Sequence, residues 1–594
     1  MAGQNWVIQA KRADFDALSK QFHINPVVAR ILVNRDIKEE DFESFLHPEL
    51  ENLYNPFLME DMNQAVRILM HDLEEGHRIR IVSDYDVDGV MSNYILYKGL
   101  KRLGAEVDYV IPHRVKDGYG INEDIIVSAA EDGIHTILTC DNGIAANAAL
   151  TKAKEFGLKV IVTDHHQVPF IMDGDKQMEI LPPADAILNP KKSTCNYPFD
   201  DLCGAGVAYK LIEALYEKKE VSEEELYSFL EFVAIATICD VVTLQNENRI
   251  FVVKGLERLN HSENKGIKAL ISVNELSNVT IDSYHVGFKL GPCINASGRL
   301  ESAIASMELL LEENHDLAVA KALQIKEVNE ERKELTLQGV ESAKEMIQSL
   351  PERKVKVIYL PDCHESLAGI IAGRLRDLYY HPVLVLCDSD TEGILKGSGR
   401  SIEGYHLFEA LQQCDEWLLK FGGHAMAAGF SLEKEKLADF EEQINVFCEL
   451  EEAAFKQKVK IDVAMPISYI TEELIREIEG LAPFGKGNEK PVFAEKDMNV
   501  LSAKILGKEH NVVKLTLESK DGCIGEAIYF DAPEFEANIV KWFGQEEYDK
   551  MLHGWLNNIV LNVVYYPTIN EFNGNRTIQL QVKRYAMAAV REVL

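Results

Sequence analysis

Between residues 78 and 188, the apolar residues follow two different patterns. Short apolar runs are separated by segments, such as 93–103 and 145–156, whose apolar residues recur with helical spacing. The apolar runs cover residues 79–82, 107–111, 136–139, 159–163 and 186–188. Strands that alternate with helices are typical of a parallel, doubly wound sheet. Residues 26–75 and 204–260, on either side, predict helices only.

Three further patterns follow in the second half of the chain. Residues 316–349 have helical spacing, many charges, no proline and one glycine, and Pro351 ends the pattern. They predict a long connecting helix. A second α/β unit follows, with strands predicted at 355–360, 382–387 and 397–400 and a helix at 367–379. The remaining strands are short and alternating, which favours a small β-barrel; they cover 492–494, 499–506, 512–517, 525–530, 559–566 and 577–585.

These patterns predict four regions in an α/β protein. They are a first α/β domain with an amino-terminal helical region (1–313), a connecting helix (314–350), a second α/β domain (351–453) and a β-barrel domain (454–594). A chain of 594 residues is too long for a single core, so several domains are expected.

Composition and charge restrict the class of protein. The chain has ten cysteines and no CxxC pair, no signal peptide is evident, and no apolar run reaches the roughly 20 residues of a membrane span. We therefore expect a cytoplasmic protein with reduced thiols, and a monomer by default. The net charge of −34 argues against a general nucleic-acid coating protein but leaves room for a local basic groove. Residues 455–594 hold 17 basic and 20 acidic side chains, so most of the excess acid lies before them.

Acidic and histidine residues follow three of the predicted strands. Asp84, Asp141 and the pair Asp164-His165 each follow an apolar run, with at most one residue between. In a doubly wound sheet these positions share the carboxyl edge, where ligands bind. Oxygen ligands with one or two imidazoles suit Mn²⁺ or Mg²⁺ better than structural Zn²⁺. Two such ions would support in-line attack on phosphorus.

These acids also have simpler interpretations. The run from Asp84 to Gly89 resembles the start of an EF-hand loop, but the twelfth loop position is Ile95, where that loop needs glutamate. A solvated acidic turn is the remaining alternative. His165 and His166 are adjacent, and neighbouring side chains of an extended chain point in opposite directions. We therefore expect one ligand, with the other histidine contacting substrate or donating a proton to the leaving oxygen.

Four segments together resemble the DHH phosphoesterase superfamily and, within it, the RecJ single-stranded-DNA-specific exonuclease family. They are 83–89, 141–143, 163–166 and 239–242. The resemblance implies a metal-ligand set of Asp84, Asp86, Asp141, His165 and Asp240, with Asp88 as an additional candidate. It implies that Asp141 bridges two Mn²⁺ or Mg²⁺ ions. Asp164 would orient a metal ligand without binding the metal itself, and His166 would face the substrate. The implied catalytic residues are therefore Asp141, Asp164, His165 and His166.

The resemblance extends over nearly the whole chain. Segments 25–62, 111–120, 291–299, 397–401 and 422–429 share it, and residues 481–594 are similar to an oligonucleotide-binding barrel of that family. It implies that the 5′ phosphate and the scissile group are held by Arg114, Arg299, Ser398, Arg400, Ser401 and His424. Donors beside flexible glycines suit phosphate, and a helix starting after 422–429 would favour anions, although a tight structural turn is a fair alternative.

Two positions depart from the family pattern. Ser83 stands where glycine is usual, for which little effect is expected, and Cys293 stands where many relatives have arginine. The second departure puts one phosphate contact in doubt. On the barrel, Lys504, Lys508, Lys514 and Phe530 are unspecific candidates for single-strand binding, and a purely structural barrel would show the same pattern.

The function implied by this resemblance is 5′→3′ hydrolysis of single-stranded DNA to 5′-mononucleotides in recombination and repair. The family role also implies a single-strand-binding protein and a helicase as partners. Two alternatives stay open. One is a DHH-type phosphodiesterase for short oligonucleotides or cyclic dinucleotides, which would typically lack the barrel. The other is a non-catalytic nucleic-acid-binding scaffold, which the intact acids disfavour.

Overall fold

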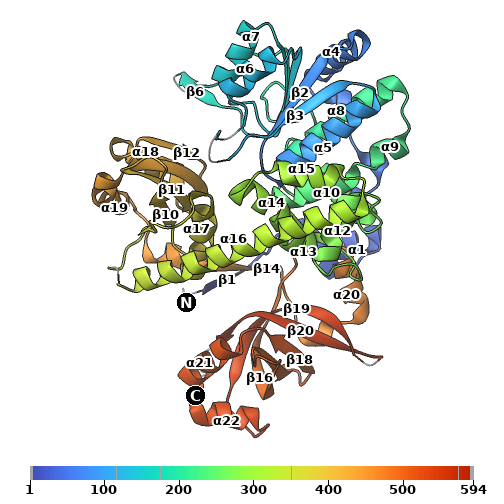
Figure 1. Ribbon diagram of the computed structural model, residues 1–594. Coiled ribbons are helices and arrows are strands. Elements are labelled where there is room, and N and C mark those ends of the chain that lie inside the picture. Colours follow the sequence, from blue (N-terminus) through green and yellow to red (C-terminus); the bar gives the residue numbers. More distant parts are fainter. Residues whose placement is uncertain are drawn as a thin grey trace. The chain divides into compact units, whose positions relative to one another are not determined.

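The computed structural model describes residues 4–114, 117–118, 120–173, 176–349, 351–572 and 574–588. Their contacts divide them into two compact units. The first contains Pro48–Gln457, and the second joins Gln4–His47 to the chain from Lys458 onward. Figure 1 shows the elements of both units in sequence colours.

The first unit contains the predicted parallel sheet. Its strand order is β3-β2-β4-β5-β8, and all four pairings are parallel. The strands are β2 (Arg78–Ser83), β3 (Glu106–Val110), β4 (Thr136–Cys140), β5 (Lys159–Thr163) and β8 (Ala186–Leu188). All five predicted strands are therefore confirmed, and the sheet is doubly wound because helices cover both faces.

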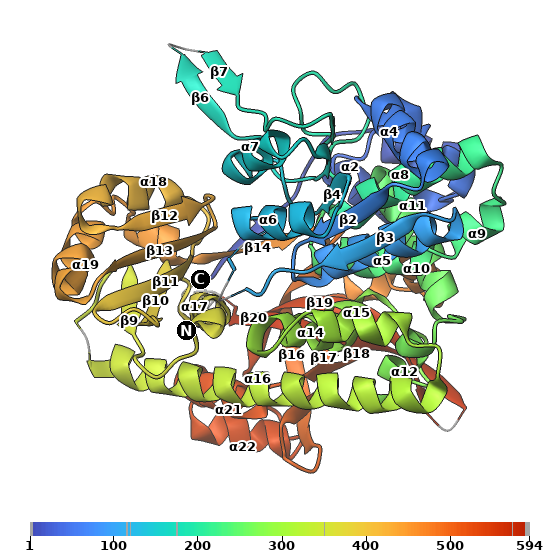
Figure 2. The same ribbon diagram turned by 45° about the horizontal axis from the view of Figure 1, so that its top comes forward.

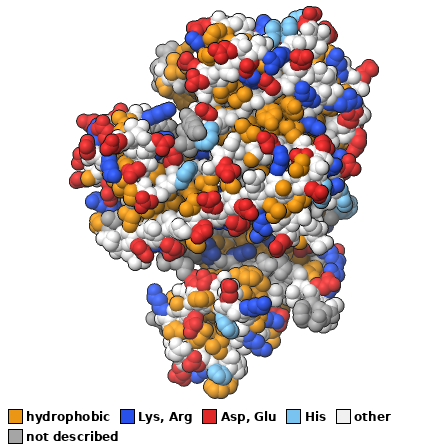
Figure 3. Space-filling model, in the orientation of Figure 1, with side chains coloured by type: hydrophobic (Ala, Val, Ile, Leu, Met, Phe, Trp, Pro, Cys, Tyr) orange, Lys and Arg blue, Asp and Glu red, His pale blue; other side chains and the backbone are white. Residues whose placement is uncertain are grey.

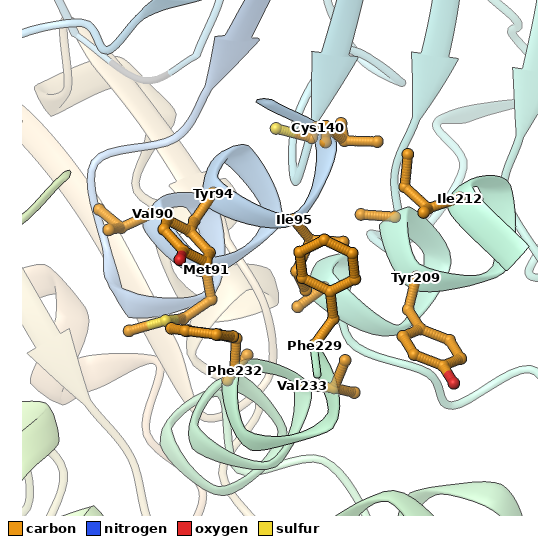
Figure 4. Close-up of a cluster of buried hydrophobic side chains, with 14 of the residues drawn as sticks. Val90, Met91, Tyr94, Ile95, Cys140, Tyr209, Ile212, Phe229, Phe232 and Val233 are labelled. Carbon is orange, nitrogen blue, oxygen red and sulfur yellow. The ribbon is translucent and has the colours of Figure 1, made fainter. Parts of the chain in front are cut away.

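Alternate residues of one strand enter two different cores. Ile137 of β4 packs with α6 (Glu123–Glu131) and α7 (Asn147–Glu155), whereas Leu138 packs with helices of the opposite face. Those helices are α4 (Met62–Glu75), α5 (Val87–Arg102), α8 (Gly204–Lys219) and α10 (Leu230–Cys239). Figure 4 shows Ile95 of α5, Tyr209 of α8 and Phe232 of α10 meeting in this second core. The apolar character of both strand faces follows from burial on both sides.

Further helices complete the first α/β domain. They are α9 (Glu223–Tyr227), α11 (Asn246–Leu259), α12 (Lys265–Val273), α13 (Ser283–His285), the π-helical turn η4 (Val286–Leu290), α14 (Gly291–Leu300) and α15 (Ile304–Leu311). A hairpin of β6 (Phe170–Asp173) and β7 (Lys176–Glu179) was not predicted. The long connecting helix is confirmed as α16 (His315–Ser349), which packs against α12, α14 and α17 (Glu365–Tyr379). Figure 2 shows its full length, below the two α/β domains in that view.

The second α/β domain is built on a mixed sheet of order β12-β13-β11-β10-β9. Only β9 and β10 are parallel, and β10, β11, β13 and β12 pair in antiparallel fashion. The strands are β9 (Lys356–Tyr359), β10 (Val383–Asp388), β11 (Ile394–Arg400), β12 (Lys420–Gly423) and β13 (Ala427–Glu433). Besides α17, helices α18 (Leu407–Gln413) and α19 (Leu437–Val446) cover it.

The second unit contains the predicted barrel. Strands β16 to β20 pair in the order β16-β17-β18-β20-β19, and a pairing of β19 with β16 closes the ring. They are β16 (Phe493–Leu506), β17 (Val512–Glu518), β18 (Ile524–Tyr529), β19 (Val560–Phe572) and β20 (Asn575–Met587). The sequence missed α21 (Ala532–Phe543) and α22 (Gln545–Leu552), which lie between β18 and β19.

The amino-terminal helices belong to this second unit. Helices α1 (Phe15–Phe22), α2 (Pro26–Asn34) and α3 (Phe42–Leu46) share a core with the barrel and with α20 (Glu472–Glu479). Hydrogen bonds between side chains and backbone hold these helices in the second unit. Asn34 Nδ2 donates to Asp462 O at 3.0 Å, and Asn25 N donates to Glu477 Oε2 at 2.6 Å. Strand β1 (Gln4–Ile8) pairs with β14 (Gln457–Ile461). The predicted domain boundaries remain a proposal, and this grouping cuts the amino-terminal region near His47 instead of keeping it with 48–313.

All ten cysteines are free thiols. Acidic and basic side chains are interspersed over the face drawn in Figure 3. Among the described helices, none combines the length and the apolar character needed to cross a membrane.

Candidate active site and metal centre

The turn between β2 and α5 carries the first acidic group. Asp86 is the N-cap of α5, and its Oδ1 accepts a hydrogen bond from Gly89 N at 3.1 Å. The helix starts so close to the strand end that a Cβ on Gly89 would lie 2.3 Å from the carbonyl oxygen of Asp84. Only glycine permits this approach, which holds Asp84 and Asp86 beside each other.

Asp88 binds the start of another helix. Its carboxylate accepts hydrogen bonds from Gly204 N at 2.6 Å and Ala205 N at 2.8 Å, in the first turn of α8. A helix amino terminus attracts negative charge, so this contact fixes α5 against α8. Oδ2 of Asp88 also lies 3.5 Å from Nε2 of His165. Asp88 therefore positions two helices at the site besides being a candidate ligand.

Asp141 lies at the centre of the site. It directly follows β4 in the left-handed region, with φ 59°, and it is 2% exposed. A Cβ on Gly204 would come within 2.7 Å of its Cβ, so glycine at the start of α8 makes room for this carboxylate. Oδ1 of Asp141 lies 3.1 Å from Nε2 of His165.

His165 points its Nε2 atom into a group of carboxylates. Besides Asp141 and Asp88, Oδ2 of Asp240 lies 3.6 Å away, at the carboxyl end of α10. Burial and the neighbouring His166 lower the pKa of His165 to about 3. The imidazole is therefore neutral, which is the form that binds metal ions.

Asp164 holds the second histidine. Its Oδ1 accepts hydrogen bonds from His166 Nδ1 at 2.8 Å and from the backbone N–H of His165 at 2.7 Å, and its Oδ2 accepts one from Ile144 N at 2.9 Å. Burial opposes ionisation of Asp164, but the hydrogen bond and charge of His166 lower its pKa to about 2. Burial likewise lowers the pKa of His166, and Asp164 more than reverses this and raises it to about 9. This placement fits the predicted orienting role of Asp164.

The prediction that the two histidines diverge is wrong. Their ring centroids are 4.5 Å apart, and Nδ1 of His166 lies 3.8 Å from Oδ1 of Asp141. Strand β5 ends at Thr163, so the alternation of an extended chain no longer applies at His165 and His166. Both rings therefore face Asp141.

The donor set fits divalent cations. Three groups of donor atoms lie within 4.8 Å, and Asp141 belongs to two of them; the groups are Asp84 with Asp86 and Asp141, Asp141 with His165 and His166, and Asp88 with His165 and Asp240. Burial and mutual repulsion raise the pKa of Asp84 and Asp141, that of Asp88 to about 7 and that of Asp240 to about 8. Oδ1 of Asp84 is buried without a hydrogen-bond partner. Cations would relieve both the repulsion and the missing contact.

Cationic side chains from both α/β domains share one electrostatic environment. The guanidinium of Arg114 lies 4.8 Å from the centroid of the Tyr85 ring. Burial and the positive charge of Arg114 lower the pKa of Arg299 to about 10, and burial, Arg376 and Arg114 lower that of Arg400. Arg299 Nη1 also donates to Ser366 O at 3.0 Å, across the two domains of the first unit. Positive charges that repel each other in this way favour an anionic ligand.

The remaining predicted residues of the second α/β domain differ in whether their side chains can contact a ligand. Ser398 lies beside Arg400, whose Nη1 is 3.4 Å from Ser398 Oγ. Ser401, in contrast, is fully buried and its hydroxyl donates to Tyr405 O at 2.7 Å, so it offers no donor to a ligand. His424 is exposed between β12 and β13. The segment 422–429 therefore contains the turn and the strand ends of a hairpin, and β13 continues after it where a helix start was expected. Tyr119 lies outside the described residues.

The structure adds positioning residues that the sequence analysis missed. Asn295 of α14 accepts a hydrogen bond from Val87 N at 3.2 Å and thereby anchors the start of α5. Asn142 donates to Val82 O and Cys140 O, both at 2.9 Å, and ties β2 to β4 behind the acids. Both asparagines lie inside segments already singled out, 291–299 and 141–143, so their place in a motif was the available signal. Cys293 contacts Asn274 and Asn329.

Comparison with known proteins agrees with this geometry. Residues 78–237 match the DHH family, N-terminal domain, residues 352–450 match the DHHA1 domain, and residues 461–584 match the RecJ OB domain. The single-stranded-DNA-specific exonuclease RecJ of Bacillus subtilis is 35% identical, over 98% of this chain and 71% of its own length. The RecJ of Escherichia coli is 31% identical, over 96% of this chain and 98% of its own length.

Solved structures show the same relationship. RecJ from Thermus thermophilus in complex with Mn²⁺ has a TM-score of 0.80 and 25% identity, over 99% of this chain and 80% of that one. A manganese-bound exonuclease RecJ has a TM-score of 0.58 and 31% identity, over 68% of this chain and all of that one. The parallel sheet and its rim of acids and histidines define a DHH phosphoesterase. Within that class, the chain belongs to the RecJ family.

Proposed function

We propose that this protein is a 5′→3′ exonuclease that hydrolyses single-stranded DNA to 5′-mononucleotides with two Mn²⁺ or Mg²⁺ ions. The observation that carries the proposal is the convergence of donor atoms from the turn after β2 and from the segment after β5 on Asp141, which belongs to two of the three candidate ligand groups at this rim. The proposed ligands are Asp84, Asp86, Asp141, His165 and Asp240. When bound, the ions would activate water and neutralise charge that develops on the phosphate.

The protein's own side chains hold and orient the substrate. The neutral ring of His165 and the carboxylate of Asp141 occupy the buried floor of the site. Asp164 fixes the ring of His166, whose side chain is 40% exposed and so can reach a phosphate oxygen or the leaving oxygen. Its position beside Asp141 supports the role of a substrate-facing group.

The arginine residues set the direction in which the strand is digested. Arg114, Arg299 and Arg400, with Ser398, would grip the terminal 5′ phosphate, because guanidinium groups bind phosphate through two parallel hydrogen bonds. Anchoring one end of the strand lets cleavage proceed from that end only. Ser401 does not belong to this set because its hydroxyl is bound to Tyr405 O.

The barrel would bind the strand by charge and stacking. Lys504 and Lys508 are exposed, and Phe530 is 62% exposed, as a stacking platform requires. Lys514 is a weaker candidate because it pairs with Glu526 at 2.8 Å. A role in recombination and repair, with a single-strand-binding protein and a helicase as partners, completes the proposal.

The test is digestion of a long single-stranded DNA with separate 5′ and 3′ labels. The expected result is early release of the 5′ label as mononucleotide in Mn²⁺, and no release in EDTA or with Asp141→Ala. Lys344→Ala, at a half-buried position on α16 where the lysine pairs with Glu341, is the control and should cut normally. Intact DNA with the wild-type protein in Mn²⁺ would refute the proposal, and cleavage of dinucleotides alone would indicate a short-substrate phosphodiesterase.

A further inference from the structure

A second cluster of metal-binding side chains lies at the other end of the same strands. Asp72, His77 and His135 bring donor atoms within 4.8 Å of one another. Asp72 is in the last turn of α4, His77 directly precedes β2, and His135 directly precedes β4. The acidic rim follows the carboxyl ends of β2 and β4, so the two clusters are separated by the length of the sheet.

The cluster is rigidly placed by the backbone. His77 N donates to Asp72 O at 2.9 Å, and His135 N donates to Arg78 O at 2.9 Å. Oδ2 of Asp72 accepts a hydrogen bond from Thr136 Oγ1 at 2.6 Å, which orients the carboxylate. A hydrogen bond behind a ligand carboxylate is a common feature of metal sites.

The geometry of the donor atoms suits a tetrahedral ion. Oδ1 of Asp72 lies 3.1 Å from Nδ1 of His77 and 3.0 Å from Nδ1 of His135. Ligands at about 2.1 Å from a tetrahedral ion lie roughly 3.4 Å apart, so a small adjustment would admit one. The two rings are stacked with centroids 3.8 Å apart, and both Nδ1 atoms lie beside the same carboxylate oxygen, so the adjustment is a rotation of one ring that turns its Nδ1 lone pair toward the ion.

The chemistry of the donors suits zinc. Two imidazoles and one carboxylate form an N₂O set, which suits Zn²⁺, whereas oxygen-rich sites suit Mg²⁺ and Mn²⁺. The side chains of His77 and His135 are 32% and 36% exposed, so an ion can enter from solvent. The ring of His71, an exposed residue, lies 5.6 Å from that of His77. Figure 3 shows histidine side chains on the surface at the end where Figure 1 places α4.

We propose that Asp72, His77 and His135 bind one Zn²⁺ ion, with His71 or water in the fourth position. The ion joins the end of α4 to the starts of β2 and β4, and so stabilises the sheet that carries the active site. It takes no part in phosphodiester cleavage, and the proposal stands independently of the proposed function. The simpler interpretation is a hydrogen-bonded trio in which both rings donate to Asp72.

Zinc titration of the metal-free full chain tests the proposal, and wild type is compared with His135→Gln because the acidic rim can also bind Zn²⁺. Stoichiometry comes from competition with a chromophoric chelator, and Co²⁺ serves as a spectroscopic substitute. The expected result is one zinc ion more per chain in the wild type than in His135→Gln. His135→Gln should weaken zinc binding at least about tenfold. Asp141→Ala should keep the ion, because it changes only the rim.

Thermal unfolding provides the second measurement and controls for folding. His135→Gln should unfold at the wild-type temperature in EDTA, but zinc should raise that temperature more in the wild type than in the variant. Its Mn²⁺-dependent nuclease activity should be unchanged. Equal zinc affinity in wild type and His135→Gln would overturn the proposal, as would loss of the zinc ion in Asp141→Ala. If His135→Gln unfolds early in EDTA, His77→Gln replaces it under the same criteria.

Discussion

The Nε2 atom of His165 lies 3.1 Å from Oδ1 of Asp141, and both side chains are buried. The distance follows from the sheet, because Cys140 and Thr163 are paired neighbours on the parallel strands β4 and β5. Asp141 and Asp164 follow these paired residues directly. The two strands thus deliver the central carboxylate and its imidazole neighbour to one point, where the orientation of each group depends on the residues behind it.

Asp164→Asn is expected to reduce kcat about 10- to 100-fold, the usual effect of losing a group that orients a ligand. The carboxylate accepts four hydrogen bonds, from Ile144 N, His165 N, His166 N and His166 Nδ1. An amide accepts through one oxygen only, so the histidines lose their fixed orientation. Steady-state kinetics at saturating Mn²⁺ measure this. An unchanged kcat would show that the orientation of His166 does not matter for the reaction.

Asp84→Asn is expected to stabilise the metal-free protein while it abolishes activity. The carboxylate is buried beside Asp86, one of its oxygens has no partner, and burial followed by the charge of Asp86 raises its pKa. Removing this charge should raise the free energy of unfolding in EDTA by about 1–2 kcal/mol. Added Mn²⁺ should stabilise the wild type more than the variant, because it binds only the intact site.

Asp108→Asn is the matched control for Asp84→Asn. Asp108 forms an ion pair with Arg80 at 2.8 Å, away from the acidic rim. The Asp108→Asn substitution should destabilise the protein equally with and without Mn²⁺ and leave activity intact. Chemical denaturation in EDTA and in Mn²⁺ measures the stability of the wild type and of both variants, and the nuclease assay measures their activity. An Asp84→Asn protein less stable than wild type in EDTA would contradict a dominant role for charge repulsion.

Arg400→Ala is expected to raise KM about 10- to 100-fold for DNA with a 5′ phosphate. Hydrogen bonds from charged groups are worth about 1.5–3 kcal/mol, which corresponds to that range. KM for DNA with a 5′ hydroxyl should change little, because that end offers no phosphate to bind. Lys396→Ala on the same strand is the control, since Lys396 pairs with Glu365 at 2.7 Å. Equal effects on both DNA ends would remove Arg400 from the 5′ phosphate site.

The elements that the sequence predicts well are those decided by local pattern. Strand β5 was predicted at its observed bounds, and α16 to within one residue of its first position, because apolar periodicity and Pro351 define both locally. The acids were predicted to meet because parallel strands present their carboxyl ends at one edge. The features that depend only on the parallel sheet could therefore be predicted from the sequence.

What the sequence could not predict depends on contacts between distant segments. Asn25 bonds with Glu477, more than 400 positions away, and this contact helps to place the amino-terminal helices with the barrel. Ser401 lies in a donor-rich motif, yet its hydroxyl turns inward to Tyr405 O. The convergence of His165 and His166 depends on the strand ending at Thr163. No periodicity signals any of these three facts.

Glu231 in the first turn of α10 should make stability depend on pH. Its side chain is buried, Oε2 has no hydrogen-bond partner, and burial raises its pKa from 4.5 to about 7 despite a hydrogen bond with Ser262. The folded protein therefore holds this proton more tightly than the unfolded chain. The resulting stabilisation is complete below pH 4.5 and is lost as the pH rises through 7.

Glu231→Gln should remove this dependence, because an amide stays neutral throughout. The variant is expected to match the wild type at pH 5 and to exceed its free energy of unfolding at pH 8 by on the order of 2 kcal/mol. Urea denaturation between pH 5 and 8 measures the difference, with Glu263→Gln, an exposed neighbour, as the control that should follow the wild type. A constant difference between Glu231→Gln and wild type across this range would show that folding does not shift the pKa of Glu231.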